Sequence, residues 1–189
     1  AYQENKRYLD GDLNRAWTQK NIARALVDND TSLSEFQEVR EILEIVQKID
    51  IKKYKRAVFL DLHTTSSQNG VFLVASIDLD HDLLGSLESP IIYGLNEALG
   101  GTAIQYFKKL GFESFVFEGG TIGDDQAVLN IEDAVWKVLS QLKMVNPKDI
   151  PVEIAQKSNL GELLKNNVPQ NLHLSYIHHI NACLVVNHF

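Results

Sequence analysis

The stretch at residues 57–70, AVFLDLHTTSSQNG, decides which fold the sequence predicts. Its first four residues form an apolar run, which is typical of a strand buried on both faces of a sheet. The run gives way to Asp61, Leu62 and His63 and then to a small polar loop. Open α/β sheets place ligands and catalytic groups at the C-terminal ends of such strands. The stretch therefore predicts an α/β protein with a site at this strand end.

Asp61 and His63 are separated by one residue, so their side chains should point to the same face of the strand. This spacing allows the carboxylate of Asp61 to lie beside the imidazole of His63, or to hold it in place as a metal ligand. A histidine at a strand end is by itself more often structural than a ligand. The functional interpretation therefore depends on the rest of the chain.

Composition indicates a globular protein with one substantial core. Hydrophobic residues make up 44% and charged residues 23% of the 189 residues. The net charge of −7 argues against nucleic acid or a membrane surface as a partner, because both recruit clustered lysine and arginine. The short basic run at residues 52–56 is best explained as a solvated loop.

Cysteine usage and hydropathy indicate a compartment. The single cysteine, Cys183, excludes an internal disulfide and a cysteine-based zinc site. No apolar stretch is long enough to span a bilayer, and no signal peptide is visible. We therefore expect a cytoplasmic protein, although the chain starts at Ala1 without a methionine and would not show an N-terminal targeting segment.

The N-terminal block AYQENKRYLDGDLNRAW concentrates polar groups among aromatic residues. Arg7, Asp10, Asp12, Asn14 and Arg15 lie within nine residues. Two arginines and an asparagine can clamp a substrate carboxylate, because the planar guanidinium fork matches the carboxylate geometry. A surface loop of mutually paired charges explains the composition equally well.

Periodicity predicts helices and strands along the rest of the chain. A Ser-x-x-Glu capping box at residues 32–35 precedes apolar residues at helical spacing, which predicts a core-packing helix to about Asp50. The other expected elements are strands at 57–60, 71–75 and 112–117 and helices at 96–110 and 126–142. The apolar residues of the last helix, among them Val128, should face the core. Residues 78–90 should form a surface loop, in which Asp80, His81 and Asp82 could bind a metal but fit an exposed polar loop better.

Glu118 follows the third of these strands and precedes two glycines. A carboxylate held by apolar neighbours has a raised proton affinity, which a general acid or base needs. A glutamate that caps a turn is an equally good explanation.

The C-terminal segment, residues 147–189, should be a small β-rich extension of a domain at residues 1–146. Residues 151–155 and the alternating pattern at residues 172–176 predict strands. His178, His179 and His188 suggest a metal site, but adjacent histidines on a strand point to opposite faces. A structural role explains these histidines better.

Three blocks carry a more specific signal: RYLDGDLNR at residues 7–15, DLHTT at 61–65 and FEGG at 117–120. Together they resemble the succinylglutamate desuccinylase/aspartoacylase family of zinc-dependent amidohydrolases, relatives of the zinc carboxypeptidases. The order and approximate spacing of the blocks fit the family, and the resemblance covers roughly residues 1–145. It implies a three-layer α/β/α sandwich with a mixed sheet.

The resemblance also implies roles for individual residues. His63 resembles the third zinc ligand, and Glu118 resembles the general base that activates the zinc-bound water and later protonates the leaving amine. Arg7 resembles the arginine that polarises the scissile carbonyl, while Asn14 and Arg15 resemble the pair that holds a substrate carboxylate. One zinc ion per full-length chain is implied, and it would lower the pKa of its bound water to about 7.

Two features depart from the family pattern. The family takes its first two zinc ligands from a His-x-x-Glu segment, and none of the five histidines from His63 to His179 has a glutamate three residues later. We therefore expect the chain to start inside the domain and to be unable to build the family's zinc site alone. Lys108 stands where aspartoacylase has an arginine that reads the acyl carboxylate. Because lysine is a point charge and not a planar fork, specificity for N-acetylaspartate does not follow.

The leading hypothesis is a zinc-dependent hydrolase that cleaves the amide bond of an N-acyl amino acid or a similar small carboxylated amide. The alternative is a carboxypeptidase-like domain without metal that serves as a binding module. The expected partners are a small carboxylated substrate and, for assembly, further copies of the chain.

Overall fold

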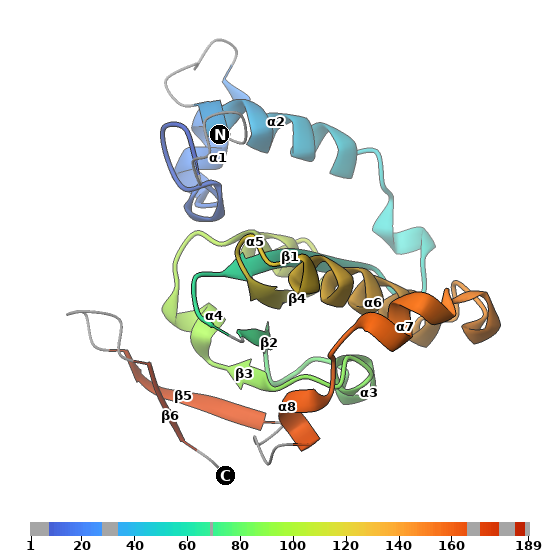
Figure 1. Ribbon diagram of the computed structural model, residues 1–189. Helices are drawn as coiled ribbons and strands as arrows, with labels where there is room; N and C mark the ends of the chain where they lie inside the picture. The colour runs from blue at the N-terminus through green and yellow to red at the C-terminus, as the bar shows by residue number, and fades with distance from the viewer. Residues whose placement is uncertain (1–7, 28–33, 69, 166–170, 178–183, 188–189) are drawn as a thin grey trace. The chain divides into compact units, whose positions relative to one another are not determined.

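The structure, a computed structural model, describes residues 8–27, 34–68, 70–165, 171–177 and 184–187 (Figure 1). The chain forms two compact units. Unit 1 comprises Ala1–Phe59 and Asn96–Ser114, and unit 2 comprises Leu60–Leu95 and Phe115–Phe189. No helix among the described residues is both long enough and apolar enough to cross a membrane.

Unit 1 is mainly helical, with η2 (Leu13–Arg15), α1 (Gln19–Leu26), α2 (Ser34–Val46), η3 (Ile51–Lys53) and α5 (Ala103–Lys109). Unit 2 contains β2 (Val71–Ala75), α3 (His81–Gly85), β3 (Ile91–Tyr93), α6 (Asp125–Gln141), η4 (Pro147–Asp149), α7 (Val152–Lys157), α8 (Glu162–Lys165), β5 (Asn171–Ile177) and β6 (Leu184–Asn187). Three elements include residues of both units: β1 (Val58–Thr65), α4 (Leu95–Ala98) and β4 (Glu113–Thr121).

The described strands form one mixed sheet in the order β1-β4-β2-β3-β5-β6. β2 is parallel to β3 and antiparallel to β4, β3 is parallel to β5, and β5 is antiparallel to β6. β1 and β4 run in the same direction, because Glu113 N donates to Ala57 O (2.8 Å) near their starts and Ile122 N donates to Thr65 O (2.9 Å) near their ends. The α/β class and the mixed sheet that the sequence predicts are confirmed.

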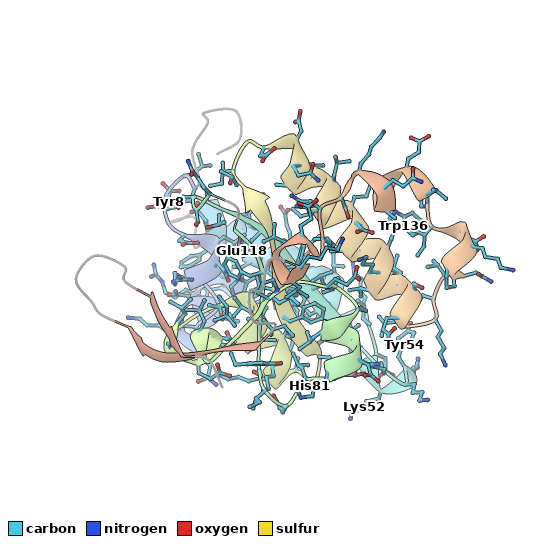
Figure 2. All side chains as sticks on the ribbon, turned by 60° about the horizontal axis from the view of Figure 1, so that its bottom comes forward. Tyr8, Lys52, Tyr54, His81, Glu118 and Trp136 are labelled. Carbon is cyan, nitrogen blue, oxygen red and sulfur yellow. The ribbon has the colours of Figure 1, made fainter. Side chains whose placement is uncertain are left out.

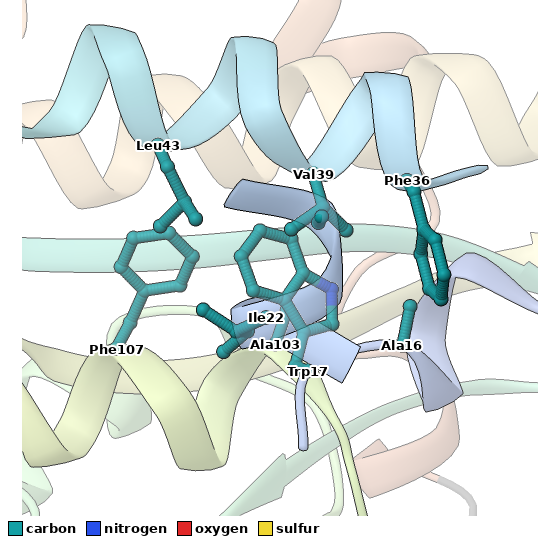
Figure 3. Close-up of a cluster of buried hydrophobic side chains, with 9 residues drawn as sticks. Ala16, Trp17, Ile22, Phe36, Val39, Leu43, Ala103 and Phe107 are labelled. Atoms are coloured by element: carbon teal, nitrogen blue, oxygen red, sulfur yellow. The ribbon is translucent and has the colours of Figure 1, made fainter. Parts of the chain in front are cut away.

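The core of unit 1 is a cluster of aromatic and aliphatic side chains, shown in Figure 3. α2 contributes Phe36, Val39 and Leu43, which are at most 2% exposed because their three-to-four spacing places them on one face of the helix. Phe107 of α5 is fully buried and stacks on Phe59 with ring centroids 3.9 Å apart. The expectation that α2 packs a core is confirmed.

Part of the core of unit 2 lies between β4 and α6. Phe115 and Phe117 of β4 are fully buried. By strand alternation Gly119 points to the same face. A Cβ atom on Gly119 would lie 2.5 Å from Ile131 Cγ1 and 2.8 Å from the carbonyl oxygen of Ala127, so α6 packs directly on the backbone of β4.

α6 begins where the sequence predicts, because Asp124 caps it by accepting from Gln126 N (2.9 Å). Its buried face differs from the prediction. Val128 is 62% exposed, whereas Asn130 and Asp133 are almost fully buried. The polar pair can be buried because Asn130 accepts from Asn159 N (3.0 Å) and Asp133 accepts from Ser158 Oγ (2.5 Å).

β1 is not buried on both faces, contrary to the prediction. All of its residues are half-buried or exposed, and Leu62 is 40% exposed. β1 stands at the end of the strand order, so only one neighbouring strand covers it among the described residues. Asp61 and His63 also lie within the strand, which continues to Thr65, and not after it.

Two other predicted segments differ from the structure. Residues 78–90 contain the helix α3, which begins after Asp80 because this residue caps it by accepting from Asp82 N (2.9 Å). Leu83 and Leu84 of α3 are fully buried. The predicted helix at residues 96–110 is divided into α4 and α5. The division falls at Gly101, whose φ of +75° is a conformation that other residues rarely adopt.

The C-terminal segment is partly as predicted. Residues 151–155 are not a strand: α7 begins at Val152, directly after Pro151, and its Glu153 and Lys157 lie 3.6 Å apart one turn along the helix. The alternating pattern at residues 172–176 is the confirmed strand β5. His178, His179 and His188 lie outside the described residues, and the boundary at residue 146 stays a prediction.

Candidate functional site

In unit 2, Asp61 and His63 point to the same face of β1, as the sequence predicts. His63 Nε2 lies 3.0 Å from Asp61 Oδ1, and the two side chains are 29% and 20% exposed. An Nε2–H group that donates to this carboxylate fixes the ring orientation and the tautomer, which places the lone pair on Nδ1. The geometry suits a metal-binding imidazole held by a carboxylate.

The described residues contain no group of three or more His, Cys, Asp and Glu side chains that could hold a metal ion. A structural zinc site needs four protein ligands and a catalytic site usually three. The described residues alone therefore do not fit a zinc centre. His81 is not part of one either, since it lies exposed at the start of α3, where Asp80 acts as the helix cap (Figure 2).

Glu118 lies on β4, between strands β1 and β2 in the sheet, so it is one strand away from His63. It pairs with Phe72 of β2 and is half-buried. Strand alternation points its side chain to the face opposite α6, because Gly119 next to it faces that helix.

Gly119 and Gly120 explain how Glu118 is held in place. Asn130 Nδ2 of α6 donates to Gly119 O (2.8 Å), and the close approach of α6 leaves no space for a side chain at Gly119. Gly120 has a φ of +141°, and a Cβ atom there would be 3.2 Å from Ala127 Cβ. The two glycines therefore allow α6 to pack on the strand directly behind Glu118.

In unit 1, Asn14 and Arg15 are adjacent on η2. Asp12 begins this turn by accepting from Asn14 N (2.9 Å). Asn14 Oδ1 accepts from Ala103 N (3.0 Å), the first residue of α5, whose own N-cap Thr102 makes no side-chain cap bond. The amide oxygen of Asn14 thus stabilises the start of α5.

Arg15 is exposed, and its Nη1 donates to Asn14 O (2.7 Å). Lys108 is exposed in the last turn of α5. Unit 1 thus brings Asn14 and Arg15 together and connects them to the helix that carries Lys108. Arg7 lies outside the described residues.

Glu35 has a contact that the sequence interpretation missed. Its side chain is buried, and its carboxylate accepts from Leu9 N (2.8 Å), Asp10 N (3.2 Å) and Gly11 N (3.1 Å). Asp10 Oδ2 in turn accepts from Ser34 N (2.8 Å) and Ser34 Oγ (2.7 Å). One signal was present in the sequence: Glu35 stands four residues before Val39 on the apolar face of α2.

Comparison with known proteins identifies the class. Residues 1–130 match the succinylglutamate desuccinylase/aspartoacylase catalytic domain. The chain belongs to this family. No match was found among curated proteins.

Three solved structures share the fold. A succinylglutamate desuccinylase from Chromobacterium violaceum is 16% identical with a TM-score of 0.62, over 97% of this chain and 57% of that one. The ectoine utilization protein EutE (DoeB) from Ruegeria pomeroyi is 12% identical with a TM-score of 0.61, over 93% and 49%. A succinylglutamate desuccinylase/aspartoacylase from Rhodobacter sphaeroides is 16% identical with a TM-score of 0.50, over 76% and 42%. The chain thus spans about half the length of the solved structures it matches.

Proposed function

We propose that the protein is a zinc-dependent hydrolase that cleaves the amide bond of an N-acyl amino acid or a similar small carboxylated amide. One observation carries the proposal: the region that matches the family, residues 1–130, contains all the proposed site residues. These are Arg7, Asn14, Arg15, His63, Lys108 and Glu118.

Each residue has a chemical role in this proposal. Glu118 takes a proton from the attacking water and later gives it to the leaving amine. Arg7 stabilises the negative charge that develops on the carbonyl oxygen. Asn14 and Arg15 bind the carboxylate of the amino acid part of the substrate. Lys108 attracts the carboxylate of the acyl group as a point charge.

Zinc dependence is part of the proposal. His63 is the proposed ligand among the described residues, because its contact with Asp61 orients the ring. At least one further ligand has to come from outside the described residues, which hold no three-residue cluster. One zinc ion per full-length protein is expected.

The proposed setting is the cytoplasm, and the proposed partner is the small carboxylated substrate. The net charge of −7 disfavours nucleic acid and anionic membranes. Assembly into a homo-oligomer is a further expectation, which sedimentation of the purified protein would test.

The test is hydrolysis by the protein expressed from its complete gene. N-succinylglutamate and N-acetylaspartate serve as probes, and the released amino acid is quantified. We expect Glu118→Gln to lower kcat by a factor of about 10² to 10⁴ with an unchanged zinc content, because it removes the proton acceptor and keeps the shape. Glu132→Gln, on the exposed side of α6, is the matched control and should retain wild-type turnover.

Full turnover by Glu118→Gln contradicts the role assigned to Glu118. The alternative function is a metal-free binding domain. It predicts that the wild-type protein binds a carboxylated amide without hydrolysing it and without zinc.

A further inference from the structure

Unit 1 contains a reciprocal set of hydrogen bonds that joins the start of α2 to the segment at residues 9–11. The carboxylate of Glu35 accepts backbone N–H groups from all three residues of the segment. Both carboxylate oxygens are used: Oε1 binds Leu9 and Asp10, while Oε2 binds Asp10 and Gly11. From the other side, Asp10 accepts both the backbone N–H and the hydroxyl of Ser34, the first residue of α2.

A general role in helix stability does not explain the placement of Glu35. A glutamate in the first turn of a helix stabilises the helix by its interaction with the macrodipole, and for this its carboxylate does not need to be buried. Glu35 is only 6% exposed. Burying a carboxylate is unfavourable unless its oxygens are hydrogen-bonded, and here the partners are supplied by the segment at 9–11. The side chain therefore fixes the path of that segment.

The same segment leads directly to the proposed substrate-binding residues. Gly11 is followed by Asp12, which starts η2, and Asn14 and Arg15 lie on η2. The chain is fixed again at η2 and directly after it, because Asn14 Oδ1 accepts from Ala103 N (3.0 Å) and Trp17 N donates to Gly101 O (3.1 Å). The proposed carboxylate-binding residues thus lie between one attachment to α2 and a second to the start of α5.

We infer that Glu35 is a positioning residue for substrate binding: its buried carboxylate holds residues 9–11 so that Asn14 and Arg15 are presented to the substrate carboxylate in a fixed geometry. This inference rests on the proposed function. Small displacements of substrate-holding groups are costly, since a shift of about 1 Å can lower the rate by a factor of about 10². Loss of the Glu35 contacts should therefore weaken substrate binding although Glu35 does not touch the substrate.

The experiment compares Glu35→Gln with Glu38→Gln in the protein expressed from its complete gene. Glutamine keeps the shape of Glu35 but replaces one acceptor oxygen by an NH₂ group that opposes a backbone N–H. Glu38 is exposed on the same helix, so Glu38→Gln makes the same change of charge without altering the buried contacts. Amide hydrogen exchange of residues 9–11 is measured together with kcat and KM for an N-acyl amino acid.

We expect Glu35→Gln to speed exchange at residues 9–11 about tenfold or more, which corresponds to the loss of one hydrogen bond to a charged group. KM should rise by a similar factor while kcat changes less, and Glu38→Gln should match the wild type in all three measurements. Asp10→Asn weakens the bonds from Ser34, the other part of the attachment of residues 9–11 to α2, and Asp10 is exposed. It therefore tests the inference even where Glu35→Gln fails to fold. It should raise exchange at Ser34 and raise KM.

Unchanged exchange at residues 9–11, or a KM equal to that of Glu38→Gln, overturns the inference and leaves the proposed function intact. A wild-type protein that hydrolyses no N-acyl amino acid instead overturns the proposed function, and the positioning role falls with it. The two failures are therefore distinguished by the wild-type activity.

Discussion

At the scale of the residue, Asp10 links the N-terminal segment to α2 through Ser34. This contact makes the stability of the folded protein depend on pH. The hydroxyl of Ser34, and next its backbone N–H, hold the pKa of Asp10 below its ordinary value of 3.8. A lowered pKa in the folded state means that the unfolded chain binds the proton more tightly. The stabilisation by Asp10 is therefore fully present above about pH 4 and is lost as the pH falls through the lowered value.

Asp10→Asn should accordingly lower the free energy of unfolding at neutral pH, and the difference from the wild type should shrink in acid. Urea unfolding between about pH 2.5 and pH 7 measures this difference. Replacing the exposed Asp125 by asparagine changes the same charge at the start of α6 and should not reproduce the acid dependence specific to the Ser34 contact. A difference between wild type and Asp10→Asn that stays constant over the whole range contradicts the assignment.

The residues proposed for the site come from sequence motifs, and the contact between Asp61 and His63 was predictable from their spacing. The contacts of Asn14 were not. Within each of the motifs at 7–15, 61–65 and 117–120 the residues are neighbours in the chain, and the motifs occur in a recognisable order. The cap that Asn14 provides to α5 joins residues 89 positions apart, and no local pattern indicates it. The contacts of Glu35 with residues 9–11 escaped prediction for the same reason, because a first-turn glutamate is normally explained by its own helix.

At the scale of the element, the packing of α6 on β4 depends on the missing side chain of Gly119. Gly119→Ala places a Cβ atom within 3 Å of Ile131 Cγ1 and of the Ala127 carbonyl oxygen, which belongs to the rigid backbone of the helix. We expect the variant to be destabilised by about 1–3 kcal/mol, as for other overpacked cores. Thermal and urea unfolding measure the loss.

Gly100→Ala is the control, because a Cβ atom at Gly100 meets nothing within 4 Å. It should be neutral or slightly stabilising, since alanine reduces the freedom of the unfolded chain. Wild-type stability of Gly119→Ala would show that α6 can move away from the strand at little cost. In that case the glycine would not be what holds Glu118 in place.

Helix α6 also shows where sequence patterns stop being informative. Its start was predictable, because Asp124 is a local cap. Its buried face was not, because Asn130 and Asp133 are buried only through partners in the turn that follows α7. Hydrophobic periodicity assigns polar residues to the outside by default and so placed Val128 inside.

At the scale of the whole molecule, the sheet combines segments that are distant in the sequence. The class of fold followed from alternating strands and helices, but the pairing of β3 with β5 joins residues about 80 positions apart and could not be predicted from local patterns. The described residues of this fold carry one histidine–carboxylate pair and no complete metal site. Zinc binding is therefore a property to be tested on the protein as a whole.

We expect the protein expressed from its complete gene to contain about one zinc ion per chain and to be stabilised by it. A ligand that binds only the folded state stabilises by about 2.7 kcal/mol at a hundredfold excess over its Kd. This corresponds to a rise in Tm of roughly 5–10 °C for a domain of about 150–250 residues. Removing the metal with a chelator should lower Tm by that amount.

Two histidine variants distinguish a zinc ligand from a histidine that does not bind the metal. His63→Ala should lose the zinc and should show the lower Tm with or without chelator, because the Asp61–His63 pair is the proposed attachment point. His81→Ala, at an exposed position on α3, should keep both the metal and its effect on Tm. A wild-type protein that carries no zinc and has the same Tm after chelation contradicts the zinc-dependent hydrolase. It would favour the metal-free binding domain, in which the arginine and asparagine of residues 7–15 hold a carboxylate that is never cleaved.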